Sequence, residues 1–281
     1  MIIYNGELHN PEYFPIPFAN RSFKYGDGLF ETILIRKGKS VFLDEHLNRL
    51  FAGMRIFQLE FSPVIFRRIL EGEIQRIIRA NNIQENGRMR VHVFRNGQGA
   101  YLPTTNTPNY LIEATTIPDP FADLYSVSLI GYPSIPLQPS PLSGFKTANA
   151  LPFTLAALYA QQKNFDRALL FSNGYVSEAH NANIFIVRKQ KVYTPPLGAA
   201  CIDGIMRRYI FDLCNQLRIS CSEKWIKEKD IYKADEIFLT NSIQGIVPVD
   251  SYQEKQLWPG NYTITPFLQN CLYQYLESSY D

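Results

Sequence analysis

The sequence predicts an α+β fold in two domains, and three observations support this prediction. Strand-like and helix-like segments mix along the chain without the regular alternation of a parallel α/β sheet. A chain of 281 residues with 46% hydrophobic content can build two modest cores. Residues 117–120 read IPDP, and two prolines in three positions oppose both a helix and a central strand. We therefore expect a small domain over residues 1–117, a linker over 118–124 and a larger domain over 125–281.

The first domain is expected to open with a hairpin that turns at Asn5-Gly6. Residues 28–35 predict a strand, and residues 37–39 a turn leading to residues 41–43. Asp44 is a plausible N-cap for a helix, and Ser62-Pro63 marks the start of a second helix. The apolar residues at helical spacing are Leu47, Leu50, Phe51, Met54 and Phe57 in the first helix, and Ile65, Ile69, Ile74, Ile77 and Ile78 in the second.

Two further strands complete this domain. Met89, Val91 and Val93 alternate with polar residues, which indicates a half-buried strand, and residues 110–116 form another. The second domain is expected to contain strands over residues 127–132, 167–172, 175–187, 236–240 and 246–249, and helices over 149–162, 204–217 and 267–277.

Composition disfavours several classes of function. The net charge of +2 is dispersed without a run of like charges, so a nucleic-acid partner is not expected. The four cysteines form no C-x-x-C pair and are typical of reduced thiols in a cytoplasmic protein. The first residues do not resemble a signal peptide, and no apolar stretch is long enough to cross a membrane.

Lys146 is the first residue that could carry chemistry. Most lysines are solvated surface charges, but this one stands among small residues ahead of an apolar helix. A buried amine there would have a depressed pKa, and imine formation and proton shuttling both require a neutral amine.

Glu178 and the segment Gly204-Ile205-Met206 complete a layout that suits pyridoxal phosphate (PLP). The lysine amine would form a Schiff base with the cofactor, the carboxylate would pair with the pyridinium nitrogen, and backbone N–H groups of Ile205 and Met206 would take the phosphate. Alone, Glu178 could equally be a solvated carboxylate at the end of a hairpin strand. Asn183, on an otherwise apolar strand, would need a buried hydrogen-bond partner.

Arg49 and Ser242 are the remaining phosphate candidates. The guanidinium of Arg49 suits a phosphate clamp, although a solvent-facing pair with Glu45 is the alternative. Ser242 could add a hydroxyl group. The four histidines share no metal-ligand spacing, so no metal is expected.

These segments together resemble the class IV aminotransferases, the fold-type IV PLP enzymes. The similar motifs, in the order of the family, are residues 25–32 (YGDGLFET), 45–50 (EHLNRL), 177–178 with 183–185, 193–196, 204–207, 234–236, 240–242 and 247–249. The resemblance implies a small N-terminal α/β domain, a larger C-terminal pseudo-barrel domain that bears the PLP lysine, PLP in the cleft between them, and a homodimer.

The family contains 4-amino-4-deoxychorismate lyases, branched-chain aminotransferases and D-amino acid aminotransferases. The Lys-x-x-Asn spacing of Lys146 and Asn149 resembles the lyases and the D-amino acid enzymes, and Asn149 is expected to contact the cofactor. Asn241 is similar to the lyase turn, where an amide could bind a substrate carboxylate.

Residues 95–101 (RNGQGAY) lack the Arg-x-His carboxylate trap of the D-amino acid enzymes and look more like the Gly-rich loop of the lyases. Gly99 stands where that loop often carries an arginine. The resemblance therefore makes Tyr101 and, in place of the missing arginine, Arg95 candidates for substrate binding. Lyase activity is the leading hypothesis; an aminotransferase, or a silent protein that kept the fold, is the alternative.

Overall fold

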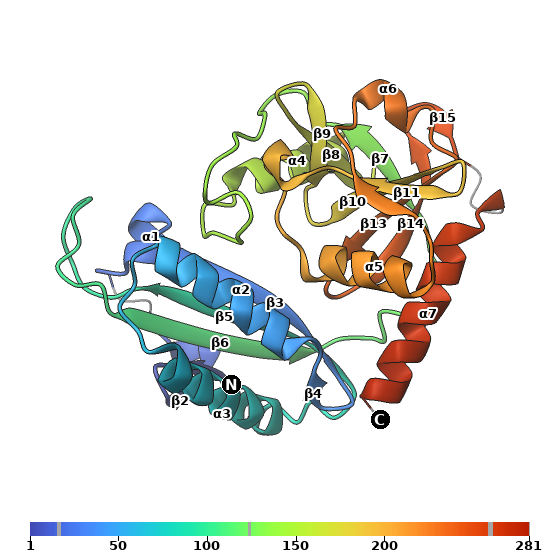
Figure 1. Cartoon of the computed structure of the whole chain (residues 1–281). Coiled ribbons are helices and arrows are strands. Elements are labelled where there is room, and N and C mark those ends of the chain that lie inside the picture. Colours follow the sequence, from blue (N-terminus) through green and yellow to red (C-terminus); the bar gives the residue numbers. More distant parts are fainter. Residues whose placement is uncertain (16–17, 123–124, 258–260, 281) are drawn as a thin grey trace. The chain divides into compact units, whose positions relative to one another are not determined.

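The computed structural model describes residues 1–15, 18–122, 125–257 and 261–280. The chain packs as two compact units, shown in Figure 1. Unit 1 comprises Met1–Asp119, Phe145–Asn149 and Tyr280, and unit 2 comprises Pro120–Gly144 and Ala150–Ser279. Residues 123 and 124 of the expected linker lie outside the described residues, so a linker over 118–124 stays a prediction.

Unit 1 contains a six-stranded antiparallel sheet in the order β2-β1-β6-β5-β3-β4. The expected hairpin at Asn5-Gly6 is confirmed, because both residues adopt positive φ angles (47° and 88°). The strands are β1 (Ile2–Tyr4), β2 (Glu7–His9), β3 (Gly28–Arg36), β4 (Lys39–Ser40), β5 (Asn86–Arg95) and β6 (Pro108–Thr116).

Two long helices, α2 (Leu43–Ile56) and α3 (Pro63–Ala80), share one core with this sheet. Met89, Val91 and Val93 of β5 point into that core. Because side chains alternate along a strand, Arg90 and His92 lie on the opposite face of the sheet. A 3₁₀ turn (Pro11–Tyr13) and the short helix α1 (Arg21–Tyr25) precede β3.

Two details of these helices differ from the sequence expectation. Helix α2 begins at Leu43 with Phe42 as its N-cap, so Asp44 lies in the first turn, where its charge favours the helix N-terminus. The N-cap at Ser62 is confirmed by its hydrogen bond from Ile65 N–H. In α3, however, Phe66 and Leu70 are buried while Ile65 and Ile69 are exposed, because the core-facing stripe starts at residue 66 and repeats every three or four residues.

The segment around Lys146 packs with unit 1, although the sequence suggested the larger domain. Its backbone runs beside the start of β3: Phe30 N–H donates to the Lys146 carbonyl (2.8 Å), and Ala148 N–H donates to the Gly28 carbonyl (2.9 Å). These bonds and the bridge between Leu29 and Thr147 join the segment to the sheet of unit 1.

Unit 2 contains a nine-stranded mixed sheet in the order β12-β11-β10-β13-β14-β7-β8-β9, with β15 paired to β14. A bridge between Ala179 and Ala182 joins β9 to β10, so the sheet curls back on itself. The strand expected over residues 175–187 is therefore two strands, divided at residues 180–182. The strands are β7 (Val127–Gly131), β8 (Arg167–Ser172), β9 (Tyr175–Ala179), β10 (Asn183–Arg188), β11 (Lys191–Thr194), β12 (Cys221–Glu223), β13 (Glu236–Asn241), β14 (Gly245–Tyr252) and β15 (Lys255–Gln256).

Helices pack against the curled sheet (Figure 1). Within the sheet, the rings of Phe185 on β10 and Phe238 on β13 stack across the strand pair, with centroids 4.9 Å apart. The helices of unit 2 are α4 (Leu151–Gln162), the 3₁₀ turn Leu197–Ala199, α5 (Ile205–Gln216), α6 (Glu228–Ile231) and α7 (Ile264–Ser279). No helix among the described residues has the length and apolar content needed to cross a membrane.

Candidate active site

Glu178 lies near the end of β9 with its side chain almost fully buried. One carboxylate oxygen accepts a hydrogen bond from Ile202 N–H (3.0 Å), and the other accepts one from the amide of Asn183 (3.3 Å). The same amide donates to the Ile202 carbonyl (2.8 Å), which supplies the buried partner expected for Asn183. Glu178 is thus a fixed carboxylate and not the solvated one of the alternative interpretation.

Directly after Ile202, the chain enters α5 through Gly204. Gly204 is the N-cap and has no side chain that could accept hydrogen bonds from the first N–H groups of the helix. Ile205 and Met206 carry these N–H groups. A Cβ atom at Gly204 would lie 2.1 Å from Asn183 Oδ1, so only glycine fits against the Asn183 side chain. Unit 2 therefore links an anchored carboxylate to an uncapped helix N-terminus, and these groups suit the ring nitrogen and the phosphate of PLP.

Asn241 ends β13, and its side chain folds back onto its own turn. Oδ1 accepts hydrogen bonds from Ile243 N–H (3.0 Å) and Gln244 N–H (2.8 Å), and Nδ2 donates to Gln244 Oε1 (2.9 Å). Asn241 therefore shapes the turn that carries Ser242. Its substrate contact stays a prediction, for which the second hydrogen of Nδ2 is left.

In unit 1, Lys146 shares an aromatic ring with an arginine that the sequence analysis did not select. The Lys146 ammonium nitrogen lies 4.9 Å from the centroid of the Phe30 ring, and Arg90 Cζ lies 3.7 Å from the same centroid. Burial lowers the pKa of Arg90, while Glu113 raises it and Arg88 lowers it further. Within the described part of the chain, the Arg90 guanidinium donates no hydrogen bond. An arginine of this kind suits a carboxylate ligand.

A signal for Arg90 was present in the sequence. The strand pattern placed Arg88, Arg90 and His92 on one face, opposite the core residues. What the pattern could not show is that β3 pairs with β5 so that Phe30 lies opposite His92, which brings the ring beside Arg90.

Arg49 is buried and pairs with Glu31. The alternative prediction, a solvent-facing pair of Arg49 with Glu45, is therefore wrong. Its Nε donates to Glu31 Oε1 (2.8 Å) and its Nη2 to Oε2 (2.5 Å), while His46 Nδ1 lies 2.7 Å from Oε2. Burial raises the pKa of the Glu31 carboxyl, but the charge of Arg49 and the hydrogen bonds from His46 and Arg49 outweigh it and hold the pKa at about 2.

His46 connects this buried network to Lys146. Burial lowers the pKa of His46, Glu31 raises it, and the positive charges of Arg49 and Lys146 lower it further. Lys146 is therefore near enough to act on the ring electrostatically. Phosphate binding by Arg49 stays a prediction, because the pair with Glu31 fixes the guanidinium without showing a ligand.

Asn149 has a partner within unit 1, and its contact with the cofactor stays a prediction. Its amide donates to the Gly26 carbonyl (3.1 Å) and packs tightly against this residue, which adopts φ = 65° as the C-cap of α1. Asn149 thus attaches the Lys146 segment to the turn before β3.

Arg95 does not suit the expected role in substrate binding. All three nitrogens of its buried guanidinium have partners: Asp27 Oδ2 (2.9 Å), Asn106 Oδ1 (2.6 Å) and the Phe57 carbonyl (2.5 Å). Tyr101, in contrast, is 91% exposed, with its ring 5.9 Å from that of Tyr25. Arg95 therefore closes the base of the loop, and Tyr101 stands at its tip.

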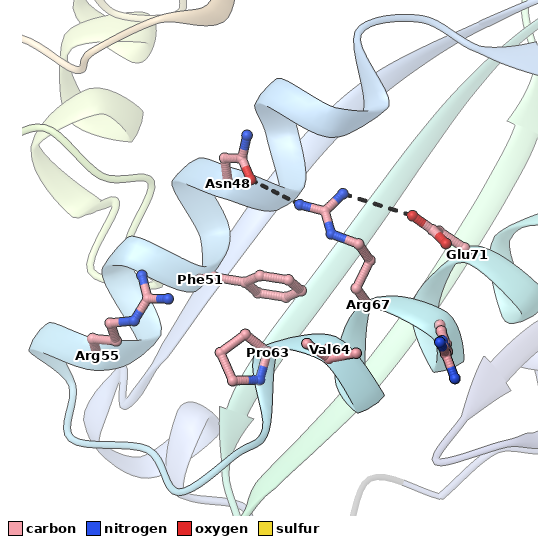
Figure 2. Close-up of a pocket in the computed structure, with 8 residues that line it drawn as sticks. Asn48, Phe51, Arg55, Pro63, Val64, Arg67 and Glu71 are labelled. Carbon is pink, nitrogen blue, oxygen red and sulfur yellow. Dashed lines mark hydrogen bonds and ion pairs between the residues drawn. The ribbon is translucent and has the colours of Figure 1, made fainter.

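A groove on the outer side of α2 and α3 contains none of the predicted site residues (Figure 2). Arg67 crosses it beside the Phe51 ring, donating to Asn48 (2.7 Å) and pairing with Glu71 (3.6 Å). Arg67 also donates to Asp44 (2.6 Å). The groove is lined by Asn48, Phe51, Arg55, Pro63, Val64, Arg67, Arg68 and Glu71. Because its central cation is already paired, we do not assign the chemistry to this groove.

Comparison with known proteins identifies the same family as the sequence motifs. The sequence pattern of the amino-transferase class IV family matches residues 28–252. The chain is 24% identical to D-alanine aminotransferase of Bacillus licheniformis, covering 92% of this chain and 90% of that protein. It is 28% identical to aminodeoxychorismate lyase of Vibrio harveyi, covering 83% and 86%. The crystal structure of Escherichia coli branched-chain amino acid aminotransferase superposes with a TM-score of 0.87 at 23% identity, covering 97% of this chain and 93% of that one.

Proposed function

The chain belongs to the class IV amino-transferase family of PLP-dependent enzymes with the type IV fold, and from this premise we propose that it is a 4-amino-4-deoxychorismate lyase. This reaction releases pyruvate and forms p-aminobenzoate, a step towards folate. The relatives include lyases and aminotransferases, so the choice rests on the residues of this chain.

The observation that carries the proposal, against a branched-chain aminotransferase, is the Arg90 guanidinium beside Lys146 on the Phe30 ring. The lyase substrate has a ring carboxylate and an enolpyruvyl carboxylate, whereas a branched-chain substrate needs an apolar pocket. Arg90 suits one of these carboxylates, and the remaining amide hydrogen of Asn241 suits another. The spacing of Lys146 and Asn149 also favours the lyase over the branched-chain enzymes.

Transamination is the second candidate, and Arg90 favours it too. A 2-oxo diacid acceptor also carries a carboxylate remote from its reacting carbon, which this guanidinium could bind. The two reactions differ in one requirement: the lyase needs no 2-oxo acid.

We assign cofactor binding to Lys146, Glu178, Arg49, Ser242 and the first turn of α5. Bound PLP supplies an electron sink for the charge released at the amine-bearing carbon of the substrate. Glu178, held by Ile202 N–H and the Asn183 amide, keeps the proton on the pyridine nitrogen.

Lys146 has the chemical role in this proposal. Its amine removes the proton from the amine-bearing carbon of the substrate, and the enolpyruvyl ether leaves from the adjacent carbon. Aromatisation supplies driving force, so positioning of the substrate by Arg90 and Asn241 is the main remaining task of the protein.

We further propose that the protein is cytoplasmic, in line with its free cysteines. We also propose a homodimer, because two large aromatic side chains at α1 of unit 1 are exposed: Phe18 is 86% and Phe23 76% exposed. A second copy of the chain would remove this surface from water. Light scattering of the purified protein tests this, and a monomer at micromolar concentration would contradict it.

Two measurements test the functional proposal. Purified enzyme should form p-aminobenzoate from 4-amino-4-deoxychorismate without any 2-oxo acid. Borohydride should attach PLP covalently to Lys146, and Lys146→Ala should abolish this labelling together with catalysis. Labelling of another lysine would refute the assignment of Lys146.

A further inference from the structure

Arg21 lies inside the loop that joins β5 to β6. Its side chain is only 3% exposed although α1, which carries it, is a short surface helix. The Nη1 atom donates to the carbonyls of Gln98 (3.4 Å), Gly99 (3.1 Å) and Ala100 (2.8 Å), and Nη2 donates to the Tyr101 carbonyl (3.4 Å). Successive carbonyl groups of the loop thus converge on one guanidinium.

The backbone of the loop follows a path that needs this cation and a glycine. Gly99 has φ = 100°, and a Cβ atom there would lie 2.3 Å from the Leu102 carbonyl oxygen. An arginine at position 99, which the lyase loop often carries, would therefore be strained in this chain. Carbonyl dipoles that point at one place repel each other unless a donor lies between them, and Arg21 provides that donor.

Asp27 fixes the position of Arg21. Its Oδ2 atom accepts hydrogen bonds from Arg21 Nε (2.8 Å) and from Arg95 Nε (2.9 Å). Arg95 in turn binds Asn106, where the loop returns towards β6. The loop is therefore held at its base by Arg95 and in its interior by Arg21, and both hold the same carboxylate.

We propose that Arg21 is a positioning residue that fixes Tyr101 and Leu102 for recognition of the substrate. This rests on the proposed function together with the expectation, implied by the family resemblance, that Tyr101 contacts the substrate. Arg21 itself is too deeply buried to do so, and it acts through the Tyr101 carbonyl and through Tyr25, whose ring lies 5.0 Å from Arg21 Cζ and next to that of Tyr101.

The test is a double-mutant cycle of Arg21→Lys and Tyr101→Ala. One ammonium group cannot span the carbonyls that the guanidinium reaches. We expect each single variant to raise KM about tenfold with kcat nearly unchanged, and the double variant to equal Tyr101→Ala alone. Arg76→Lys is the matched control, because Arg76 also donates to a backbone carbonyl of unit 1, that of Gly6, in a different turn.

Hydrogen exchange provides a readout that does not depend on activity. In Arg21→Lys, the amides of Gln98 and Thr104, which bond across the loop, should exchange faster, while those of β5 keep their protection. Unchanged exchange in the loop, an unchanged KM, or additive effects in the cycle would each overturn the proposal.

The cycle also separates this inference from the proposed reaction. It can be run on lyase or on transaminase turnover, whichever the wild type catalyses. Absence of p-aminobenzoate would refute the lyase proposal and leave the Arg21–Tyr101 coupling to be measured. A normal KM for Tyr101→Ala would refute the role of the loop even in an active lyase.

Discussion

The guanidinium of Arg90 lies over the ring of Phe30, 3.7 Å from its centroid, on the face of the unit 1 sheet opposite the core. Lys146 reaches the same ring at 4.9 Å. The Arg90 guanidinium is half-buried and donates no hydrogen bond within the described part of the chain. A substrate carboxylate beside it would gain a charge-assisted contact, which is why we propose this place as the carboxylate site.

Replacing Arg90 should therefore weaken substrate binding and spare the cofactor. A charge-assisted hydrogen bond contributes about 1.5–3 kcal/mol, so Arg90→Met should raise KM roughly 10- to 100-fold. Arg88→Gln is the matched control, because Arg88 is exposed on the same face of the same strand. Equal KM values for the two variants would show that Arg90 does not bind the substrate.

Glu178→Gln should leave PLP bound but slow turnover by about a hundredfold, because a neutral amide cannot hold the pyridinium proton. The glutamine can still accept the hydrogen bond from Ile202 N–H, so the fold around it should persist. Glu236→Gln is the control: Glu236 is a second buried carboxylate of unit 2 that caps the start of α7. If Glu178→Gln turned over as fast as Glu236→Gln, the electron-sink assignment would be wrong.

Asn241→Asp separates the two tasks of this side chain. An aspartate keeps an oxygen for the N–H groups of Ile243 and Gln244, but it replaces the amide donor with a negative charge. KM for the lyase substrate should rise at least about tenfold with cofactor absorbance unchanged. Asn241→Ala should also lower the melting temperature, because the turn loses its acceptor. A normal KM for Asn241→Asp would exclude the substrate contact.

His180 predicts a pH dependence of stability. Its Nδ1 accepts a hydrogen bond from Ala168 N–H, and burial, with the charge of Arg167, lowers its pKa from 6.5 to about 4. At a pH between these two pKa values, His180 is protonated in the unfolded chain and neutral in the folded chain. The free energy of unfolding therefore falls as the pH is lowered through this window, by at most about 1.4 kcal/mol per pH unit.

The variant His180→Asn should flatten that dependence, since an asparagine oxygen can replace Nδ1 as the acceptor without titrating. Urea unfolding at several pH values between 4 and 6.5 measures it. An identical slope in the variant would show that another group accounts for the loss of stability at low pH. His92 is one such group, because burial and the charge of Arg90 lower its pKa to about 4.

Sequence patterns predicted the local structure well where one physical cause dominates. Asn5-Gly6 forms its hairpin turn, and Ser62-Pro63 starts α3, because the turn and the cap depend on neighbouring residues alone. The division of residues 175–187 into β9 and β10 was missed, because the bridge between Ala179 and Ala182 depends on how the sheet curls.

The candidate site shows the same limit. Residue type and order nominated Lys146, Glu178 and the start of α5, and their roles stay predictions. The hydrogen-bond partners of the arginines were not predictable. Arg49 donates to Glu31 of β3, and Arg95 donates to Asp27, Asn106 and the Phe57 carbonyl. Such contacts between residues distant in sequence require the register of the sheet, which composition and spacing do not contain.

Lyase activity is tested by the product that the wild-type enzyme forms from 4-amino-4-deoxychorismate, assayed beside L- and D-amino acids with 2-oxoglutarate. We expect p-aminobenzoate and pyruvate in equal amounts, without any 2-oxo acid acceptor, and only slow transamination of leucine and isoleucine. Fast exchange between leucine and 2-oxoglutarate, with no p-aminobenzoate, would contradict it.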